Sequence, residues 1–93
     1  MVIGKVIGNV WATRKDEKLN GLKFLVVAPS KTTYEGGMSA FVAVDNVGAG
    51  IGETVLVTKG SAAKSSFDIK AVPIDAVIVG IIDSLEVEES LLK

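Results

Sequence analysis

Apolar residues recur at every second position over residues 2–12, which is the repeat of a β-strand. The even positions are small and wholly apolar, whereas the odd positions mix large apolar side chains with polar ones. This alternation predicts a strand with one face in the core and a second face that is partly covered. Gly4 and Gly8 interrupt the pattern, and we expect them to mark bends that let a sheet curl into a barrel.

Further apolar runs, bounded by glycine, proline and polar loop residues, predict more strands. These strands are expected at residues 22–28, 40–44, 53–58 and 76–82. The Asn20-Gly21 pair predicts a tight hairpin turn before the second strand, in a connection that the charged residues 14–18 widen. Residues 60–64 predict one helical turn with Ser61 as its cap, and residues 84–93 fit either a helix or a last strand. The pattern therefore indicates an all-β fold, a small barrel or sandwich.

Two of these runs predict more burial than a small barrel supplies. Residues 76–82 are apolar on both faces and residues 22–28 nearly so, which is typical of strands covered on both sides. A one-layer barrel covers only the inner face of each strand, and the chain offers almost no helix for the outer face. We therefore expect a second subunit to cover it, with Trp11 at a subunit contact or at the rim of the core.

Composition narrows the classes of partner. The 93 residues suffice for a single domain, 48% of them are apolar and the mean hydropathy is +0.46. The net charge of −1 argues against electrostatic attraction to nucleic acid or to an anionic membrane. Six basic residues fall within residues 1–31, while acidic residues crowd residues 83–89. Solvated edges explain this asymmetry, and charge complementarity between neighbouring subunits is the alternative. We expect no secretory signal and no membrane span.

The side chains offer little catalytic chemistry. Without cysteine or histidine, disulfides, thiolate nucleophiles, cysteine zinc sites and a Ser-His-Asp triad are excluded. Ser61 and Lys64 are three residues apart, but a capping role for Ser61 needs no chemistry. The acidic residues are expected in solvent or in turn hydrogen bonds rather than as an acid/base pair; they are Asp45, Glu53, Asp68, Asp75 and Asp83. We therefore predict that the protein is not an enzyme and has no cofactor and no metal ion.

A glycine-rich loop over residues 45–53 has three glycines at alternate positions, where positive φ and close backbone approach are possible. The spacing differs from the dinucleotide fingerprint, whose last two glycines are separated by two residues and which opens a helix. A strand follows here instead, and the chain contains no Gly-Lys-Ser/Thr sequence. We interpret the loop as a backbone hinge or a contact between identical subunits, not as a phosphate site.

Several segments in one order resemble a known family, namely residues 4–13, 19–25, 43–53, 60–64 and 73–83. Together they are similar to the EutN/CcmL family of bacterial microcompartment vertex proteins, over residues 1 to about 83. The resemblance implies a five-stranded OB-like β-barrel that forms a cyclic homopentamer with a narrow axial pore. Such pentamers cap the fivefold vertices of a shell that hexameric proteins otherwise tile, around enclosed enzymes. No catalysis is implied.

The resemblance also implies an organisation and a set of contact segments. A single domain spans residues 1–93, with a core over 1–83 and a tail over 84–93. Segments near subunit contacts or the fivefold axis are expected at Gly48, Ala49, Gly50, Gly60, Ser61 and Ala62. The expected partners are further copies of the chain, hexameric shell proteins and enclosed enzymes, in a shell within the cytoplasm. The alternative is a small OB-like module that binds single-stranded nucleic acid, by aromatic stacking, or another ligand, although the aromatic residues are scattered.

Overall fold

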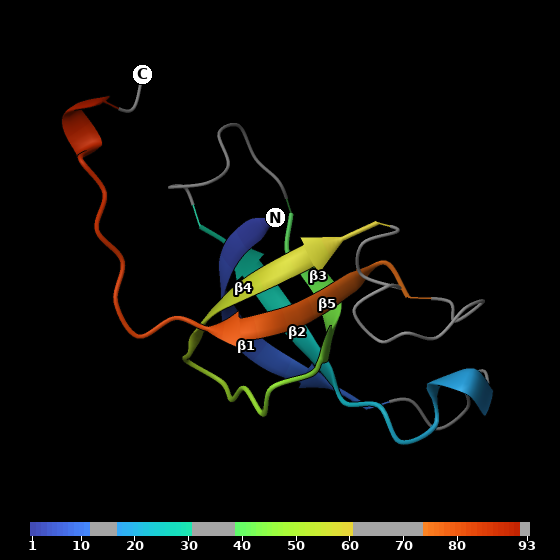
Figure 1. Ribbon diagram of the computed structural model, residues 1–93. Coiled ribbons are helices and arrows are strands. Elements are labelled where there is room, and N and C mark those ends of the chain that lie inside the picture. Colours follow the sequence, from blue (N-terminus) through green and yellow to red (C-terminus); the bar gives the residue numbers. More distant parts are fainter. Residues whose placement is uncertain (12–16, 31–38, 61–73, 92–93) are drawn as a thin grey trace.

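Five β-strands close into a barrel in the order β1-β2-β3-β5-β4 (Figure 1). The structure is a computed structural model that describes residues 1–11, 17–30, 39–60 and 74–91. The strands are β1 (Val2–Val10), β2 (Phe24–Pro29), β3 (Phe41–Asp45), β4 (Thr54–Lys59) and β5 (Ala76–Ile81). Neighbouring strands are antiparallel except β3 and β5, which are parallel. The predicted all-β barrel of five strands is confirmed, with boundaries within about two residues of those expected.

The alternation in β1 places its even positions inside the barrel, as predicted. Val2 and Val6 are buried, whereas Lys5 and Ile7 are exposed. The pairing of β1 with β2 shifts register between Val6 and Gly8, so one extra residue bends the strand there. This bulge confirms the bend that was expected at Gly8.

Aliphatic side chains of all five strands fill the barrel interior. The buried residues of this core are Val2, Val6, Leu25, Val27, Ala43, Ala49, Val55, Val57, Ala76 and Ile78. They are small, because the inside of a five-stranded barrel leaves room for little more than the side chains themselves.

A second apolar cluster lies outside the barrel, and it corrects one expectation. Val44, Ile74 and Val77 are buried there and pack against partly buried residues that include Leu19 and Leu22. The connection between β1 and β2 thus covers this part of the outer face of β5. The expectation that a second subunit must cover β5 is therefore wrong at Val77, because the chain's own connection, with its short 3-10 helix η1 (Glu17–Leu19), does so.

That connection also corrects the predicted tight hairpin. Gly21 has a φ of 82°, and the amide of Leu22 donates to the carbonyl of Leu19 at 3.2 Å, so a turn does form here. It does not join two paired strands directly, because β1 ends at residue 10 and β2 begins at residue 24. Apolar contacts of the connection with the outer face of the barrel determine its path instead.

Several large apolar side chains remain exposed on the isolated subunit. Trp11 is 90% exposed and Ile51 is 62% exposed, and Ile7 and Val42 are also exposed. Trp11 therefore does not lie at the rim of the core, which was one of its two expected places. Its other expected place, a subunit contact, stays a prediction.

The chain leaves the barrel after β5 (Figure 1). Residues 82–88 have no regular secondary structure, and a 3-10 helix, η2, spans Glu89–Leu91. This resolves the ambiguous tail as neither a long helix nor a sixth strand over the described residues 84–91. Among the described residues no helix is long and apolar enough to cross a membrane. The helical turn predicted at residues 60–64 lies outside the described residues beyond Gly60.

β1 and β2 approach each other closely at Gly4. A Cβ atom built there would lie 2.5 Å from Cγ1 of Val27 and 2.7 Å from the carbonyl oxygen of Ala28. We expect Gly4→Ala to lower the free energy of unfolding by about 1–3 kcal/mol, because the strands must separate to admit the methyl group. Thermal and denaturant unfolding at matched protein concentrations would measure the loss.

Gly8 provides the matched control in the same strand. A Cβ atom there meets Val26 at 3.8 Å, an ordinary van der Waals distance. Gly8→Ala should therefore unfold close to the original chain. Equal stability of the two variants would contradict a steric requirement at Gly4.

Candidate functional site

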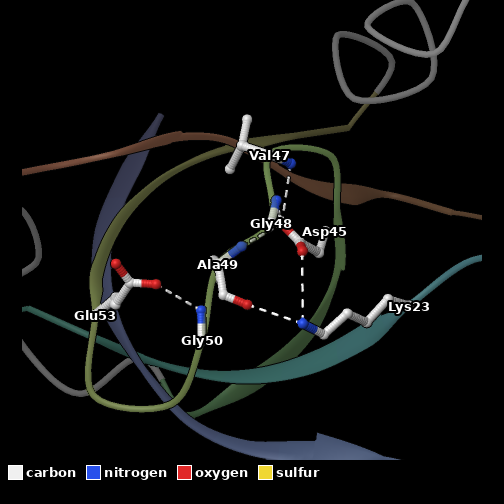
Figure 2. Close-up of polar contacts among 7 residues, drawn as sticks. All are labelled: Lys23, Asp45, Val47, Gly48, Ala49, Gly50 and Glu53. Atoms are coloured by element: carbon white, nitrogen blue, oxygen red, sulfur yellow. Dashed lines mark hydrogen bonds and ion pairs between the residues drawn. The ribbon is translucent and has the colours of Figure 1, made fainter.

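The loop between β3 and β4, residues 45–53, is organised by one carboxylate (Figure 2). Oδ1 of Asp45 accepts hydrogen bonds from the amides of Val47, Gly48 and Ala49 at 3.0, 3.1 and 3.1 Å. An aspartate that bonds to amides just after it in the chain forms this kind of turn without help from other elements. The Asp45 side chain is only 4% exposed, so three amide donors compensate much of the loss of hydration of its charge.

Lys23, just before β2, joins the loop to the neighbouring strand. Its Nζ donates to the carbonyl oxygen of Ala49 at 3.0 Å and lies 3.9 Å from Oδ2 of Asp45. The lysine side chain is half exposed, so the ion pair itself adds little stability. Its hydrogen bond does fix the position of Ala49, whose methyl group is buried in the barrel core.

A second carboxylate holds the other half of the loop. Oε1 of Glu53 accepts from the amide of Gly50 at 2.7 Å, and the amide of Glu53 donates to the carbonyl of Gly50 at 3.1 Å. Val6 in β1 then exchanges backbone hydrogen bonds with Gly52 and Glu53, at 2.8 and 3.0 Å. The loop is therefore connected to β1 and, through Lys23, to the segment just before β2.

This geometry argues against phosphate binding. The amides of residues 47–50, 52 and 53 all donate to acceptors of their own chain. A phosphate cradle needs such amides free to point at the ligand, in a positive potential. Here two carboxylates accept from four of these amides and add negative charge, and backbone carbonyls accept from the other two.

The three glycines of the loop differ in backbone conformation. Gly48 and Gly52 have φ values of 82° and 94°, which other residues rarely adopt, whereas Gly50 is not among the positive-φ glycines. The expectation of positive φ thus holds for two of the three alternate glycines. At Gly50 a Cβ atom would meet only Oε1 of Glu53, at 3.5 Å, so the subunit itself leaves space there.

The other candidate segment begins at the end of β4. Gly60 has a φ of 71°, and its amide donates to the carbonyl of Asp75 at 2.7 Å, which ties the ends of β4 and β5 together. Ser61 and Ala62 lie outside the described residues, as does Lys64. The structure thus brings Gly48, Ala49 and Gly50 together in one loop and leaves their relation to Ser61 and Ala62 open.

The described part of the chain offers no assembled reaction centre. An open hollow of about 170 Å³ at one end of the barrel is lined by Phe24, Val42, Ala43, Val44, Ile74, Asp75 and Ala76. Asp75 is the one ionisable group among these residues. Among residues 1–11, 17–30, 39–60 and 74–91, no group of three or more His, Cys, Asp or Glu side chains could hold a metal ion. The expectation of turn hydrogen bonds is confirmed for Asp45 and Glu53, and Asp68 lies outside the described residues.

Comparison with known proteins agrees with this reading of the barrel. The sequence model of the family described as "Ethanolamine utilisation protein EutN/carboxysome" matches residues 1–83. The chain belongs to the EutN/CcmL family. The family match covers both candidate segments and all five strands, and it leaves out the tail.

Relatives in the EutN/CcmL family cover nearly the whole chain. The microcompartment shell vertex protein GrpN of Rhodospirillum rubrum is 48% identical over 86 residues, which are 92% of this chain and 97% of GrpN. The carboxysome shell vertex protein CcmL of Synechococcus elongatus is 42% identical over 88 residues, 95% of this chain and 89% of CcmL. The solved structure of GrpN, described as a pentameric microcompartment shell protein, has a TM-score of 0.79 and covers 94% of this chain and 99% of its own.

The contribution of Lys23 to this loop was not predicted from the sequence, because no motif connects Lys23 with the loop. The role of Asp45 had a usable signal, because an aspartate followed by Asn46 and, two positions later, by Gly48 is typical of a side-chain-capped turn. Nothing in the spacing of the glycines indicated that Ala49 would be part of the barrel core.

We expect Asp45→Ala to loosen the loop while the barrel remains folded. Three amides lose their acceptor, at a cost of about 1–3 kcal/mol in unfolding free energy. Hydrogen exchange at the amides of Val47, Gly48 and Ala49 should become faster than in the original chain. Asp45→Asn, which keeps Oδ1 as an acceptor, should show a smaller change, and equal exchange in the alanine variant would contradict this role.

Proposed function

We propose that this chain is a structural shell protein that forms a homopentamer and caps the fivefold vertices of a bacterial microcompartment. The observation that carries the proposal is the likeness to GrpN, a pentameric shell protein, at 48% identity over 94% of this chain. A second pentameric shell protein, MSM0273 from the RMM microcompartment, has a TM-score of 0.76 at 43% identity. Each of these two alignments covers at least 90% of both chains, so the aligned residues include the whole barrel.

The surface of the isolated barrel supports association between copies. Exposed apolar side chains occur at separate places on the subunit: Ile7 on β1, Trp11 just after it, Val42 on β3 and Ile51 on the glycine-rich loop. Large exposed apolar residues at distinct sites fit a ring, in which each copy presents two different faces to its neighbours. A cyclic pentamer of this kind is closed and leaves no unsatisfied face along the ring.

Further partners follow from the proposed place in the shell. We propose hexameric shell proteins as the flanking neighbours and enclosed enzymes as further partners, with the shell lying in the cytoplasm. The proposed role is structural, which the naming of the relatives GrpN and CcmL as shell vertex proteins supports. The proposed pentamer fills positions in the shell where sixfold symmetric tiles do not fit.

The nucleic-acid alternative finds no support in the barrel. Phe24 packs in the outer apolar cluster, and Phe41 packs against the core with Nζ of Lys59 4.1 Å from its ring centroid. These rings are occupied within the subunit and do not form a row along a basic groove, which stacking on single strands requires. The net charge of −1 also removes the usual electrostatic contribution.

Native mass spectrometry tests the central proposal. We expect a five-subunit species at micromolar concentration, because the exposed apolar faces become buried only in the ring. A monomer at that concentration would refute the proposal, and a hexamer would require a different place in the shell. A filter-binding assay with single-stranded DNA at low salt should show no retention.

We further propose that Gly48, Ala49, Gly50, Gly60, Ser61 and Ala62 mark segments at subunit contacts or near the fivefold axis. Gly50→Val tests this for the loop, because Gly50 has ordinary φ and space for a Cβ atom within its own subunit. We expect soluble, folded protein with a reduced pentamer fraction, measured by circular dichroism and native mass spectrometry.

Gly52→Val is the contrasting variant, because its φ of 94° strains any other residue inside the subunit. It should lower the stability of the barrel itself. If Gly50→Val assembles as well as the original chain, Gly50 does not lie at a close contact. Insoluble Gly50→Val protein would place its role within the subunit instead.

A further inference from the structure

The tail beyond β5 projects from its own barrel, although Leu85 near its start still lines a hollow on the outer face of that barrel. The amide of Ile82 still donates to the carbonyl of Thr54 at 2.8 Å, whereas Ser90 and Leu91 donate to Glu88 within the tail, at 2.9 and 3.0 Å. Figure 1 shows residues 83–91, here called the arm, leaving the barrel in orange and red. The subunit is accordingly 47 Å long, against 24 Å in the other two directions.

The arm has the pattern of a strand that lies against another surface. Leu85 and Val87 alternate with Glu86 and Glu88, so an extended arm has one aliphatic side and one acidic side. Leu85, Val87 and Leu91 are all exposed, Leu91 at 79%. A row of exposed aliphatic side chains on a projecting segment indicates a surface that becomes covered.

A complementary surface lies on the outer face of β1. Here an open, mainly apolar hollow of about 370 Å³ is lined by Ile3, Lys5, Ile7, Pro29, Thr54 and, from the arm, Leu85. Lys5 is exposed between the two isoleucines. The hollow thus presents aliphatic groups around one cation, which matches the aliphatic and acidic sides of the arm.

We propose that the arm of one subunit docks in this hollow on the next copy of the chain. Val87 then packs against Ile3 and Ile7, and the carboxylates of Glu86 and Glu88 lie near Lys5. The proposal rests on the homopentamer proposed above, because the ring supplies the next copy. Each subunit gives one arm and receives one, which is a head-to-tail contact that a closed ring satisfies at every position.

The chain's own geometry favours a neighbouring copy over its own barrel. The chain bends once at Asp83, and the described residues 84–88 beyond it contain no further turn or bend that would fold the arm back onto its own β1. Residues 83–88, when extended, span about 20 Å at about 3.3 Å per residue, and η2 adds about 6 Å at about 2 Å per residue, so the arm is about as long as the 24 Å short dimension of the subunit. The arm is therefore long enough to cross an adjacent subunit.

Cysteine pairs test the contact directly, because the natural chain contains no cysteine. Full-length chains with Lys5→Cys and with Val87→Cys would be co-expressed with different tags, and the purified pentamer would be oxidised. We expect a disulfide-linked dimer of the two tagged chains on a non-reducing gel. The bond requires the two Cα atoms to approach within about 7 Å.

Controls separate the possible outcomes. Val42→Cys replaces an exposed residue on β3 and, paired with Val87→Cys, should give no cross-link. In a chain that carries both Lys5→Cys and Val87→Cys, a linked ladder up to five chains supports docking between copies. An internal cross-link within single chains overturns it in favour of the chain's own barrel. An uncross-linked pentamer also overturns it and leaves the arm to another shell protein.

A second measurement does not depend on disulfide formation. Val87→Asp in the full-length chain should raise the dissociation constant of the pentamer about tenfold or more, whereas Val87→Ile should leave it nearly unchanged. Equal dissociation constants for the two variants would overturn the docking of the arm but would leave the proposed pentamer intact. A monomeric original chain would instead refute the pentamer itself, and with it the docking of the arm.

Discussion

Barrel closure depends on one bent strand. β1 pairs with β4 through residues 2–5 and with β2 through residues 4–10, so a single strand bridges two sides of the barrel. The bulge between Val6 and Gly8 supplies the bend, and the bare backbone of Gly4 lets β2 approach closely enough to close the ring. Val6, next to the bulge, then bonds to residues 52 and 53 of the glycine-rich loop. The position of that loop is thus a consequence of how β1 bends.

A closed barrel of this size has consequences for function. Its interior is filled by valine, alanine and a few larger aliphatic residues, which leaves no enclosed site for a substrate among the described residues. What the subunit can offer is its outer surface. That surface combines exposed apolar side chains with a loop whose polar groups are satisfied internally. Such a surface suits contacts between rigid subunits better than chemistry, because its backbone does not have to reorganise on binding.

The fold was largely predictable from the sequence, and the reasons are visible at particular residues. The alternation over residues 2–12 and the aliphatic run at 76–82 directly reflect which side chains are buried. The ends of these two strands were therefore predicted to within two residues. The path of residues 17–23 was not predictable in this way. Asn20-Gly21 indicates a turn from local chemistry, but the packing of Leu19 and Leu22 against Val77 depends on residues more than fifty positions away. Local patterns carry no information about such contacts.

The candidate site shows the same division between local and long-range causes. Asp45 and Gly48 belong to a local turn and could be understood from their spacing, whereas Lys23 reaches Ala49 from the segment just before β2, 26 positions away. The glycine-rich loop is therefore less a hinge than a braced element, held by two carboxylates and one lysine. Its hydrogen bonds keep its amides from any ligand, and its buried alanine fixes it to the core. Among the side chains that it leaves outside, Val47 and Ile51 are aliphatic and Asn46 is polar. A loop with both carboxylates bonded to its own amides and two aliphatic side chains exposed favours contact with another protein surface over binding of a small anion.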